Sequence, residues 1–387
     1  MESIFYLTFV FFVASASDLP GHLKPFGSHT TPAEVEVVTE FPEPKDFYEK
    51  YQRGGGKPVH FKSVLKNVDF KPFKRWTDDY LNEKFGEETV MVEKYKKEVR
   101  DAGTNTMSLR KFLSVYKEKD IYMVQDLLDV MRDDMSIPRS IQCGGFQNVM
   151  ETVVLWFSSG GTKSVLHLDE MENFNCLLDG TKDLVMVDRK FKAEIEDRGW
   201  MANGVYSEMD VDKVDMEKYP MVNKVQTFKV SMEPGDCLYI PYMWYHQVNS
   251  FGNRNLAVNI WFVHIPWFNY TDCDNVATPE QTVPFQRFGF MSEFKRASTT
   301  FLRPLFDYPE VTTNIFLHEY VTEDVDEVTR GEILNYIDVD KDGVLSWNEL
   351  LKVDVVAFVK EFERHLSVDP ELLENIGANP YGGHDEL

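Results

Sequence analysis

Residues 164–188, SVLHLDEMENFNCLLDGTKDLVMVD, contain the pattern that decides the fold. The segments 164–169, 173–178 and 182–187 are short apolar runs typical of β-strands, and Asp179-Gly180 is a common hairpin turn. Similar runs, separated by Gly, Pro and Asp turns, occur at 152–157, 225–230, 236–240 and 255–263. Many short strands joined in this way predict a mainly β, α+β protein: a double-stranded β-helix of the jelly-roll type with flanking helices.

The hairpin expected at Asp179-Gly180 would pair Leu177 with Lys182 and Asn173 with Met186. Side-chain alternation would then place six residues on one face: Asn173, Asn175, Leu177, Lys182, Leu184 and Met186. A lysine and two asparagines inside a barrel are costly to bury unless they meet a polar ligand, such as a dicarboxylate co-substrate. The alternative, that this is the wetter face of an edge hairpin, stays open.

A metal-ligand pattern begins in the same stretch. His167 and Asp169 are two residues apart, so on a strand both side chains leave the same face. A second imidazole, His246 of Trp244-Tyr-His246, follows far downstream beside another apolar run. Two histidines and one carboxylate with open positions opposite them form the ligand set of non-heme Fe(II) oxygenases. The triplet alone is weak evidence in a chain with nine histidines, so its surroundings decide its meaning.

The chain of 387 residues is long enough for one large core and a smaller module. Its formal net charge of −23 argues against nucleic acid or an anionic membrane as the main partner, because both attract a basic surface.

Both ends of the chain carry targeting signals. The apolar run from Ile4 to Val13, followed by Ala14-Ser-Ala16, predicts a signal peptide over residues 1–16. The last four residues, His384-Asp-Glu-Leu387, form a receptor-read address for retention in the endoplasmic reticulum. No other stretch is long and apolar enough to span a membrane. We therefore expect a soluble protein of the endoplasmic reticulum lumen, with the retention receptor as one partner.

The four cysteines lie in a chain expected to enter an oxidising compartment, and they allow three complete pairings. Cys176 and Cys237 lie within apolar strands and are expected to be free buried thiols. Cys143 and Cys273 are candidates for a bridge. Asn269-Tyr-Thr271 is an N-glycosylation acceptor sequence, which predicts a glycoprotein if the chain enters the lumen.

A second metal-binding pattern lies near the C-terminus. Residues 338–349, DVDKDGVLSWNE, match the twelve-residue EF-hand loop at every position, and helical patterns flank them. The expected Ca²⁺ ligands are Asp338, Asp340, Asp342, Val344, Ser346 and Glu349. EF-hands usually occur in pairs, but the sequence has no second loop of this form. A regulatory role for Ca²⁺ is a hypothesis.

These signals divide the chain into six segments: a signal peptide (1–16), an extended leader (17–45), a barrel domain (46–270), a helical linker region (271–320), an EF-hand module (321–366) and a tail ending in HDEL (367–387). Within the barrel domain, capping residues and apolar spacing predict helices over 47–53, 77–85 and 108–116.

Taken together, five motifs resemble those of JmjC-domain oxygenases, specifically the protein-hydroxylase branch with a cupin barrel. They are HLDEMENF (167–174), DGTKDLVMVD (179–188), PGDCLYIP (234–241), WYHQV (244–248) and NIWF (259–262). The resemblance extends from about Phe47 to Trp267.

This resemblance implies specific roles. His167, Asp169 and His246 would bind Fe(II), and Lys182 would bind the distal carboxylate of 2-oxoglutarate. Four further residues would lie beside that co-substrate or behind it: Asn173, Ser164, Asn259 and Tyr122, the last resembling a tyrosine carried on a helix. Trp244, Tyr245 and Trp261 would line the pocket or belong to the core.

The implied activity is oxidative decarboxylation of 2-oxoglutarate to succinate, coupled to hydroxylation of an unactivated C–H bond. With the luminal signals, the expected function is a Fe(II)- and 2-oxoglutarate-dependent hydroxylase of luminal or secretory protein side chains, with bound Ca²⁺. Two alternatives stay open: a catalytically silent luminal Ca²⁺-binding or chaperone-like protein, and a JmjC-type demethylase. The sequence leaves the oligomeric state undetermined.

Overall fold

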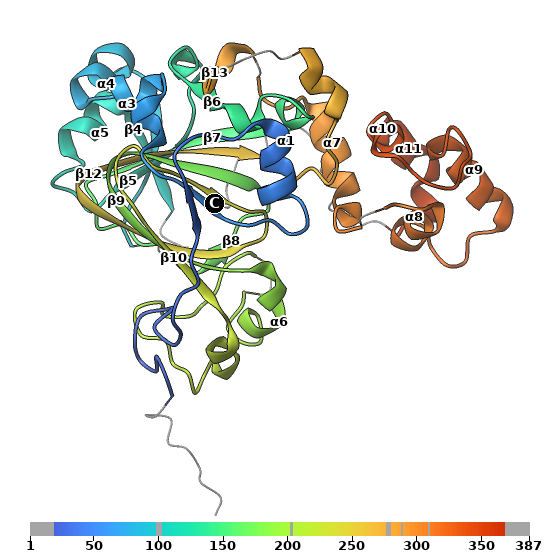
Figure 1. Ribbon diagram of the computed structural model, residues 1–387, viewed down its shortest axis with the longest axis horizontal. Helices are drawn as coiled ribbons and strands as arrows, with labels where there is room; N and C mark the ends of the chain where they lie inside the picture. Colours follow the sequence, from blue (N-terminus) through green and yellow to red (C-terminus); the bar gives the residue numbers. More distant parts are fainter. Residues whose placement is uncertain are drawn as a thin grey trace, which may run out of the picture.

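Two long antiparallel strands, β9 (Glu172–Val187) and β12 (Tyr245–Phe262), pair along most of their length at the centre of the protein (Figure 1). The computed structural model describes residues 19–97, 103–201, 204–275, 280–287, 289–308 and 310–367. The expected signal peptide and the HDEL tail lie outside these residues. Among the residues described, no helix is both long and apolar enough to cross a membrane.

The two long strands belong to two sheet halves. The first half of β9 pairs with β11 (Cys237–Ile240), and its second half pairs with β10 (Thr227–Met232). Next to the HxD motif, β8 (His167–Leu168) pairs with β12. The larger half continues on both sides through β1 (Glu36–Val38), β2 (Val59–Phe61), β7 (Met150–Ser158), β5 (Tyr122–Asp126), β3 (Thr89–Glu93) and β4 (Thr104–Ser108). This mixed sheet with flanking helices is consistent with the expected jelly-roll architecture.

The hairpin predicted at Asp179-Gly180 is wrong. β9 continues through this point, where a bulge bends it: Thr181 lies opposite Phe251, Asp179 opposite Leu256 and Leu177 opposite Ala257. Leu177 and Lys182 therefore do not pair with each other. The unpaired residues reverse side-chain alternation between the two halves of the strand. Asn173, Asn175 and Lys182 consequently line the same cavity, as predicted, although for a different reason.

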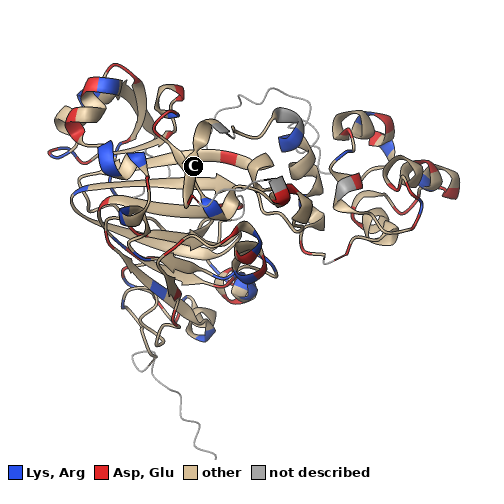
Figure 2. Cartoon of the chain, turned by 45° about the horizontal axis from the view of Figure 1, so that its top comes forward, with Lys and Arg blue, Asp and Glu red and all other residues tan. Residues whose placement is uncertain are grey.

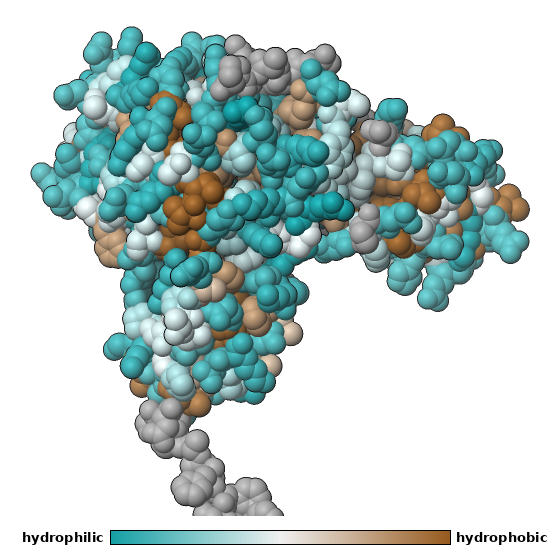
Figure 3. Space-filling view, viewed as in Figure 1, coloured by the Kyte–Doolittle hydropathy of each residue, from teal (hydrophilic) through white to brown (hydrophobic). Residues whose placement is uncertain are grey.

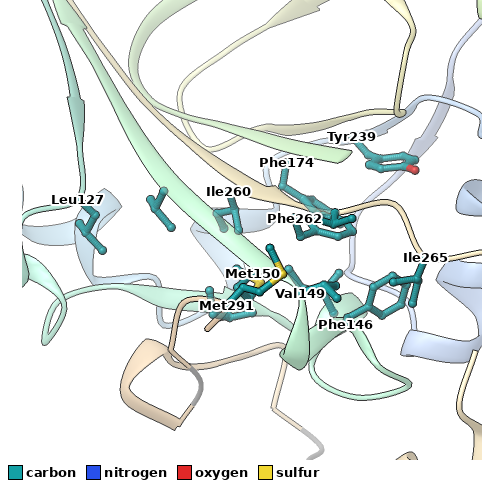
Figure 4. Close-up of a cluster of buried hydrophobic side chains, with 14 of the residues drawn as sticks. Leu127, Phe146, Val149, Met150, Phe174, Tyr239, Ile260, Phe262, Ile265 and Met291 are labelled. Carbon is teal, nitrogen blue, oxygen red and sulfur yellow. The ribbon is translucent and has the colours of Figure 1, made fainter. Parts of the chain in front are cut away.

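The opposite face of β9 contributes to an aromatic core (Figure 4). Phe174 stacks on Phe61 at 5.6 Å between ring centroids, and Tyr239 meets Phe47 edge-on at 4.9 Å. Each of these side chains is fully buried. Burial of a phenylalanine stabilises the fold by roughly 1.5–3 kcal/mol, so this core fixes the sheet on which the cavity is built.

Short helices cover the larger sheet half. They are α1 (Pro44–Phe47), a π-helical turn (Tyr48–Gln52), α2 (Val64–Asn67), α3 (Lys71–Arg75), α4 (Asp78–Phe85) and α5 (Leu109–Val115). The Thr77 hydroxyl accepts a hydrogen bond from the Tyr80 amide, and the Ser108 hydroxyl accepts one from Lys111, as the predicted helix starts require. Single 3₁₀ turns lie at 129–131, 139–141, 146–148, 270–275 and 285–287, and β13 (Thr282–Pro284) pairs with β6 (Ser136–Pro138).

Residues 189–201 and 204–224 pack on the outside of the smaller sheet half. They contain a 3₁₀ turn (Arg189–Phe191), α6 (Lys192–Ile195) and a second 3₁₀ turn (Pro220–Lys224). The buried Met216 and Val214 share a core with Phe26 and with Val187 of β9. The segment expected to be an extended leader thus contributes a buried aromatic residue and, further on, strand β1.

Two disulfides are present. Cys143–Cys273 joins segments 130 residues apart, as the sequence suggested. The prediction of free thiols at Cys176 and Cys237 is wrong, because these residues lie directly opposite each other on β9 and β11 and form the second bridge. Their register depends on strand pairing across 61 residues, which local sequence does not specify.

A helical module lies beside the barrel, drawn in orange and red in Figure 1. Its elements are α7 (Glu293–Leu302), a 3₁₀ turn (Arg303–Leu305), α8 (Thr313–Tyr320), α9 (Glu327–Ile337), α10 (Trp347–Leu350), α11 (Val355–Phe362) and a last 3₁₀ turn (Glu363–His365). The acidic loop between α9 and α10 pairs with the segment before α8: the Leu345 amide donates to the Val311 carbonyl at 2.8 Å. The helical pattern that follows the loop is interrupted, because α10 ends at Leu350 and α11 begins at Val355.

Charged residues are sparse on the barrel strands and frequent on helices and loops (Figure 2). The face seen in Figure 3 is mostly hydrophilic, with small apolar patches.

Candidate active site

The structure brings the three predicted iron ligands together inside the barrel. β8 and β12 pair so that His167 lies directly opposite His246, and Asp169 follows immediately after β8. The Asp169 carboxylate lies 4.0 Å from Nε2 of His167 and 3.5 Å from Nε2 of His246. Potential ligand atoms of all three residues lie within 4.8 Å of one another, which is compatible with a single metal ion.

Backbone carbonyls orient both imidazoles. Nδ1 of His167 lies 3.0 Å from the Val165 carbonyl oxygen, and Nδ1 of His246 lies 3.0 Å from that of Trp244. A carbonyl can only accept, so each Nδ1 donates its proton and leaves Nε2 free to bind a metal.

His246 is 3% exposed, and burial lowers the pKa of its imidazole to about 4. Nearby His167 lowers that pKa further, whereas the Asp169 carboxylate partly offsets the effect. A neutral imidazole is the form that binds metal, so His246 needs no deprotonation near neutral pH.

The cavity that holds the triad also holds Lys182. This side chain is 5% exposed, and its Nζ donates to the Ser250 hydroxyl at 3.2 Å. Burial lowers the pKa of Lys182 to about 8, so the ammonium form still predominates at pH 7. In the described part of the chain, no carboxylate forms an ion pair with it. A buried ammonium group without a counter-ion is unfavourable, which indicates an anionic ligand.

Several other buried polar atoms in this cavity have no hydrogen-bond partner. They are the amide oxygens of Asn173, Asn175 and Asn259 and the indole nitrogens of Trp156 and Trp261. Buried polar groups in proteins are nearly always paired. Unpaired acceptors and donors in one cavity, together with a free cation, therefore fit a polar ligand that supplies their partners.

Two further predicted site residues, Ser164 and Tyr122, border the cavity. The Ser164 hydroxyl borders the cavity and accepts a hydrogen bond from the Val248 amide at 2.9 Å, so it ties the loop before His167 to β12. Tyr122 borders the cavity as well, but the expectation that a helix carries it is wrong: it begins strand β5, where it lies over Trp156.

The aromatic residues divide between cavity and core. Trp261 lines the cavity, whereas the Trp244 indole donates to the Gly55 carbonyl and the Tyr245 hydroxyl donates to Glu196 outside it. The sequence interpretation missed Trp156 and Ser250 altogether. Trp156 belongs to a predicted strand, and its alternation with Phe157 was the available signal.

The acidic loop brings together the carboxylates of Asp338, Asp340 and Asp342. Asp338 is 7% exposed, and its Oδ1 has no hydrogen-bond partner, while Oδ2 accepts from the Gly343 amide at 3.1 Å. Glu349 accepts from the amide of Val339 at 3.0 Å and from the Ser346 hydroxyl at 2.7 Å. Val344 pairs with Thr312 in an isolated bridge.

Comparison with known proteins assigns the barrel domain to a protein family. Residues 44–267 match the family of cupin-like domains. The chain belongs to this family. The matched region contains the triad, Lys182 and the cavity, whereas the acidic loop lies beyond it.

Named relatives have different activities. The chain is 31% identical to chicken (Gallus gallus) tRNA wybutosine-synthesizing protein 5 over 42% of this chain and 49% of that protein. It is 27% identical to Jumonji C domain-containing protein 5 of Drosophila melanogaster, over 49% of this chain and 50% of the relative. It is also 27% identical to lysine-specific demethylase 8 of Xenopus tropicalis, over 53% and 48%. The chain thus spans about half the length of these relatives.

The JmjC members of this family are generally 2-oxoglutarate-dependent oxygenases that use Fe(II). The donors present here fit that chemistry: two oriented imidazoles, one carboxylate, a buried ammonium group for a second carboxylate, and unpaired polar atoms between them.

Proposed function

We propose that this protein is a Fe(II)- and 2-oxoglutarate-dependent hydroxylase of protein side chains in the endoplasmic reticulum lumen, and that its acidic loop binds Ca²⁺. The observation that supports the enzyme most is one cavity containing both the His167–Asp169–His246 triad and the buried cation of Lys182. A protein that kept the barrel only as a scaffold would have no need of an uncompensated buried charge.

Each residue has a distinct task in this proposal. His167, Asp169 and His246 would hold iron, which when bound activates O₂ and couples decarboxylation of the keto acid to C–H oxidation. Lys182 would bind the distal carboxylate of 2-oxoglutarate and so fix its orientation. Trp156 and Trp261 would shield the reacting end from water while their indole nitrogens donate to the ligand.

The substrate class rests on charge and compartment. The names of the relatives refer to both tRNA and lysine modification, so they do not decide the substrate class. The net charge of −23 disfavours a polyanionic substrate. The two disulfides favour an oxidising compartment, as do the targeting signals at both ends. Histones are not in that compartment, so a luminal or secretory protein is the substrate we favour over a histone.

The acidic loop supplies an oxygen-rich site for Ca²⁺. Side chains of Asp338, Asp340, Asp342, Ser346 and Glu349 and the carbonyl of Val344 would be the ligands. The unpartnered, buried oxygen of Asp338 supports this proposal, because it belongs to a cluster of three carboxylates and has no hydrogen-bond donor. Asn269, the proposed glycosylation site, is exposed, and its amide oxygen accepts a hydrogen bond from the Thr271 hydroxyl.

The test is incubation of the full chain with Fe(II), 2-oxoglutarate, O₂ and a library of secretory-protein peptides. We expect succinate, together with a peptide that gains one oxygen atom. Loss of a methyl group from a methylated peptide would instead indicate the demethylase. If no succinate forms beyond that of a His167→Ala control, the silent Ca²⁺-binding alternative is favoured.

A further inference from the structure

The loop that carries Asp169 is held by the turn that precedes His246. The Met243 amide donates to the Asp169 carbonyl at 2.9 Å, and the Tyr242 amide donates to the Glu172 carboxylate at 2.9 Å. Glu172 is fully buried, and its carboxylate also lies 2.5 Å from Nδ1 of His264. Tyr242 and Met243 are adjacent, so one turn bonds both Glu172 and Asp169. The position of the proposed iron ligand Asp169 is therefore linked to the contacts of Glu172.

The helical module docks onto this same loop. Arg303, in the 3₁₀ turn after α7, forms an ion pair with Glu170, the residue next to Asp169. One turn further, the Phe306 ring lies 6.1 Å from the ring of His264. The module thus contacts the loop directly through Arg303. It also contacts His264, the buried partner of Glu172, through Phe306.

The acidic loop is connected to the contact between Phe306 and His264 through Trp347. Trp347, between the proposed ligands Ser346 and Glu349, stacks on Trp267 of the barrel domain at 4.9 Å between ring centroids and 18° between planes. The same indole lies 5.7 Å from Phe306. Figure 1 shows α10, which Trp347 begins, on the side of the module that faces the barrel.

Glu349 links cation binding to the position of Trp347. Ser346 and Glu349 form a capping box at the start of α10, so the Glu349 carboxylate now bonds the residue before Trp347. The last loop residue binds Ca²⁺ with both oxygens, and Oε1 of Glu349 already accepts hydrogen bonds from the Val339 and Asp340 amides of the acidic loop. A cation held by Glu349 would therefore also fix the start of α10 and the indole at its first position.

We propose that the helical module positions the Asp169 loop and that Ca²⁺ in the acidic loop thereby tightens metal binding at His167, Asp169 and His246. The proposal rests on the function proposed above. Ca²⁺ orders α10 against Trp267 and Phe306, which supports the Arg303–Glu170 contact and restrains Asp169. Because coupling between sites is reciprocal, metal in the triad tightens Ca²⁺ binding by the same factor.

The test measures two affinities separately on the full chain. Fe(II) affinity is followed anaerobically at saturating 2-oxoglutarate by the visible charge-transfer band, and Ca²⁺ affinity by calorimetry. We expect saturating Ca²⁺ to lower the Fe(II) dissociation constant about tenfold, within the usual range of allosteric coupling. In Glu349→Gln this effect should disappear together with Ca²⁺ binding.

Two further variants separate coupling from folding. Arg303→Glu should retain Ca²⁺ binding but lose the effect of Ca²⁺ on Fe(II), and Glu170→Arg combined with Arg303→Glu should restore it. Val328→Ala, at a valine of α9 that is 72% exposed, is the matched control and should behave as the wild type. Ca²⁺ binding without any change in Fe(II) affinity would overturn the coupling alone. A missing charge-transfer band in every condition would overturn the proposed function as well.

Discussion

Lys182 is the residue whose surroundings most directly predict a ligand. Its ammonium group is buried, hydrogen-bonded only to Ser250 among the contacts described, and close to several unpaired amide oxygens. Burial alone accounts for its lowered pKa. A single side chain therefore allows two predictions, one on affinity and one on pH.

Replacing Lys182 by alanine should weaken 2-oxoglutarate binding about 100-fold, because a buried charged hydrogen bond is worth roughly 3 kcal/mol. Fe(II) binding should change little, since the triad stays intact. Calorimetric titration of 2-oxoglutarate into the Mn²⁺-loaded protein measures the effect. Lys190→Ala, at an exposed lysine after β9, is the control. Equal losses in both variants would contradict the assignment.

The pKa of Lys182, lowered to about 8, gives a pH dependence of definite sign. The carboxylates of 2-oxoglutarate are ionised throughout, so only Lys182 loses charge as the pH rises. The dissociation constant should increase about tenfold from about pH 7 to about pH 9 in the wild type. In Lys182→Arg, whose guanidinium stays charged, the same titration should be nearly flat. A flat wild-type profile would mean that the ammonium group does not bind the co-substrate.

At the scale of elements, the bulge in β9 decides which side chains reach the cavity. Gly180 has φ +77°, and a Cβ there would lie 2.6 Å from the Arg254 carbonyl oxygen. Gly180→Ala should therefore lower the free energy of unfolding by about 3 kcal/mol, from backbone strain and the clash together.

Gly161 provides the matched control for this substitution. Its φ is +75°, but a Cβ would meet no atom within 4 Å, so Gly161→Ala should cost only the strain, about 1 kcal/mol. Urea denaturation of both variants gives the comparison. Equal costs would show that the close approach at the bulge is unimportant.

Strand positions could be predicted because apolar runs and turn residues are recognisable within short windows. The cavity-facing set was predicted only in part, since Trp156 and Ser250 were missed and the bulge decides which side chains of β9 reach the cavity. Strand pairing could not be predicted. The sequence Asp179-Gly180 favours a hairpin, and only the long partner strand β12 turns it into a bulge. For the same reason, the sequence around Cys176 did not indicate a disulfide with Cys237, and the sequence around Tyr122 did not indicate a strand. His167, Asp169 and His246 were predictable, since their motifs are local even though their meeting point is not.

At the scale of the whole molecule, the barrel and the helical module form one continuous set of contacts. Within the module, the acidic loop pairs with residues 311–313, just before and at the start of α8. The stacking of Trp347 on Trp267 joins residues 80 positions apart and has no local sequence signal. Domain boundaries drawn from sequence alone therefore separate segments that contact each other.

The central claim, that this cavity binds iron and a keto acid together, is tested most directly by anaerobic titration of Fe(II) into the protein with 2-oxoglutarate. We predict a visible charge-transfer band that saturates at one Fe(II) per chain and is absent in His167→Ala. A protein that binds both components without such a band, or whose band survives in His167→Ala, would contradict the account.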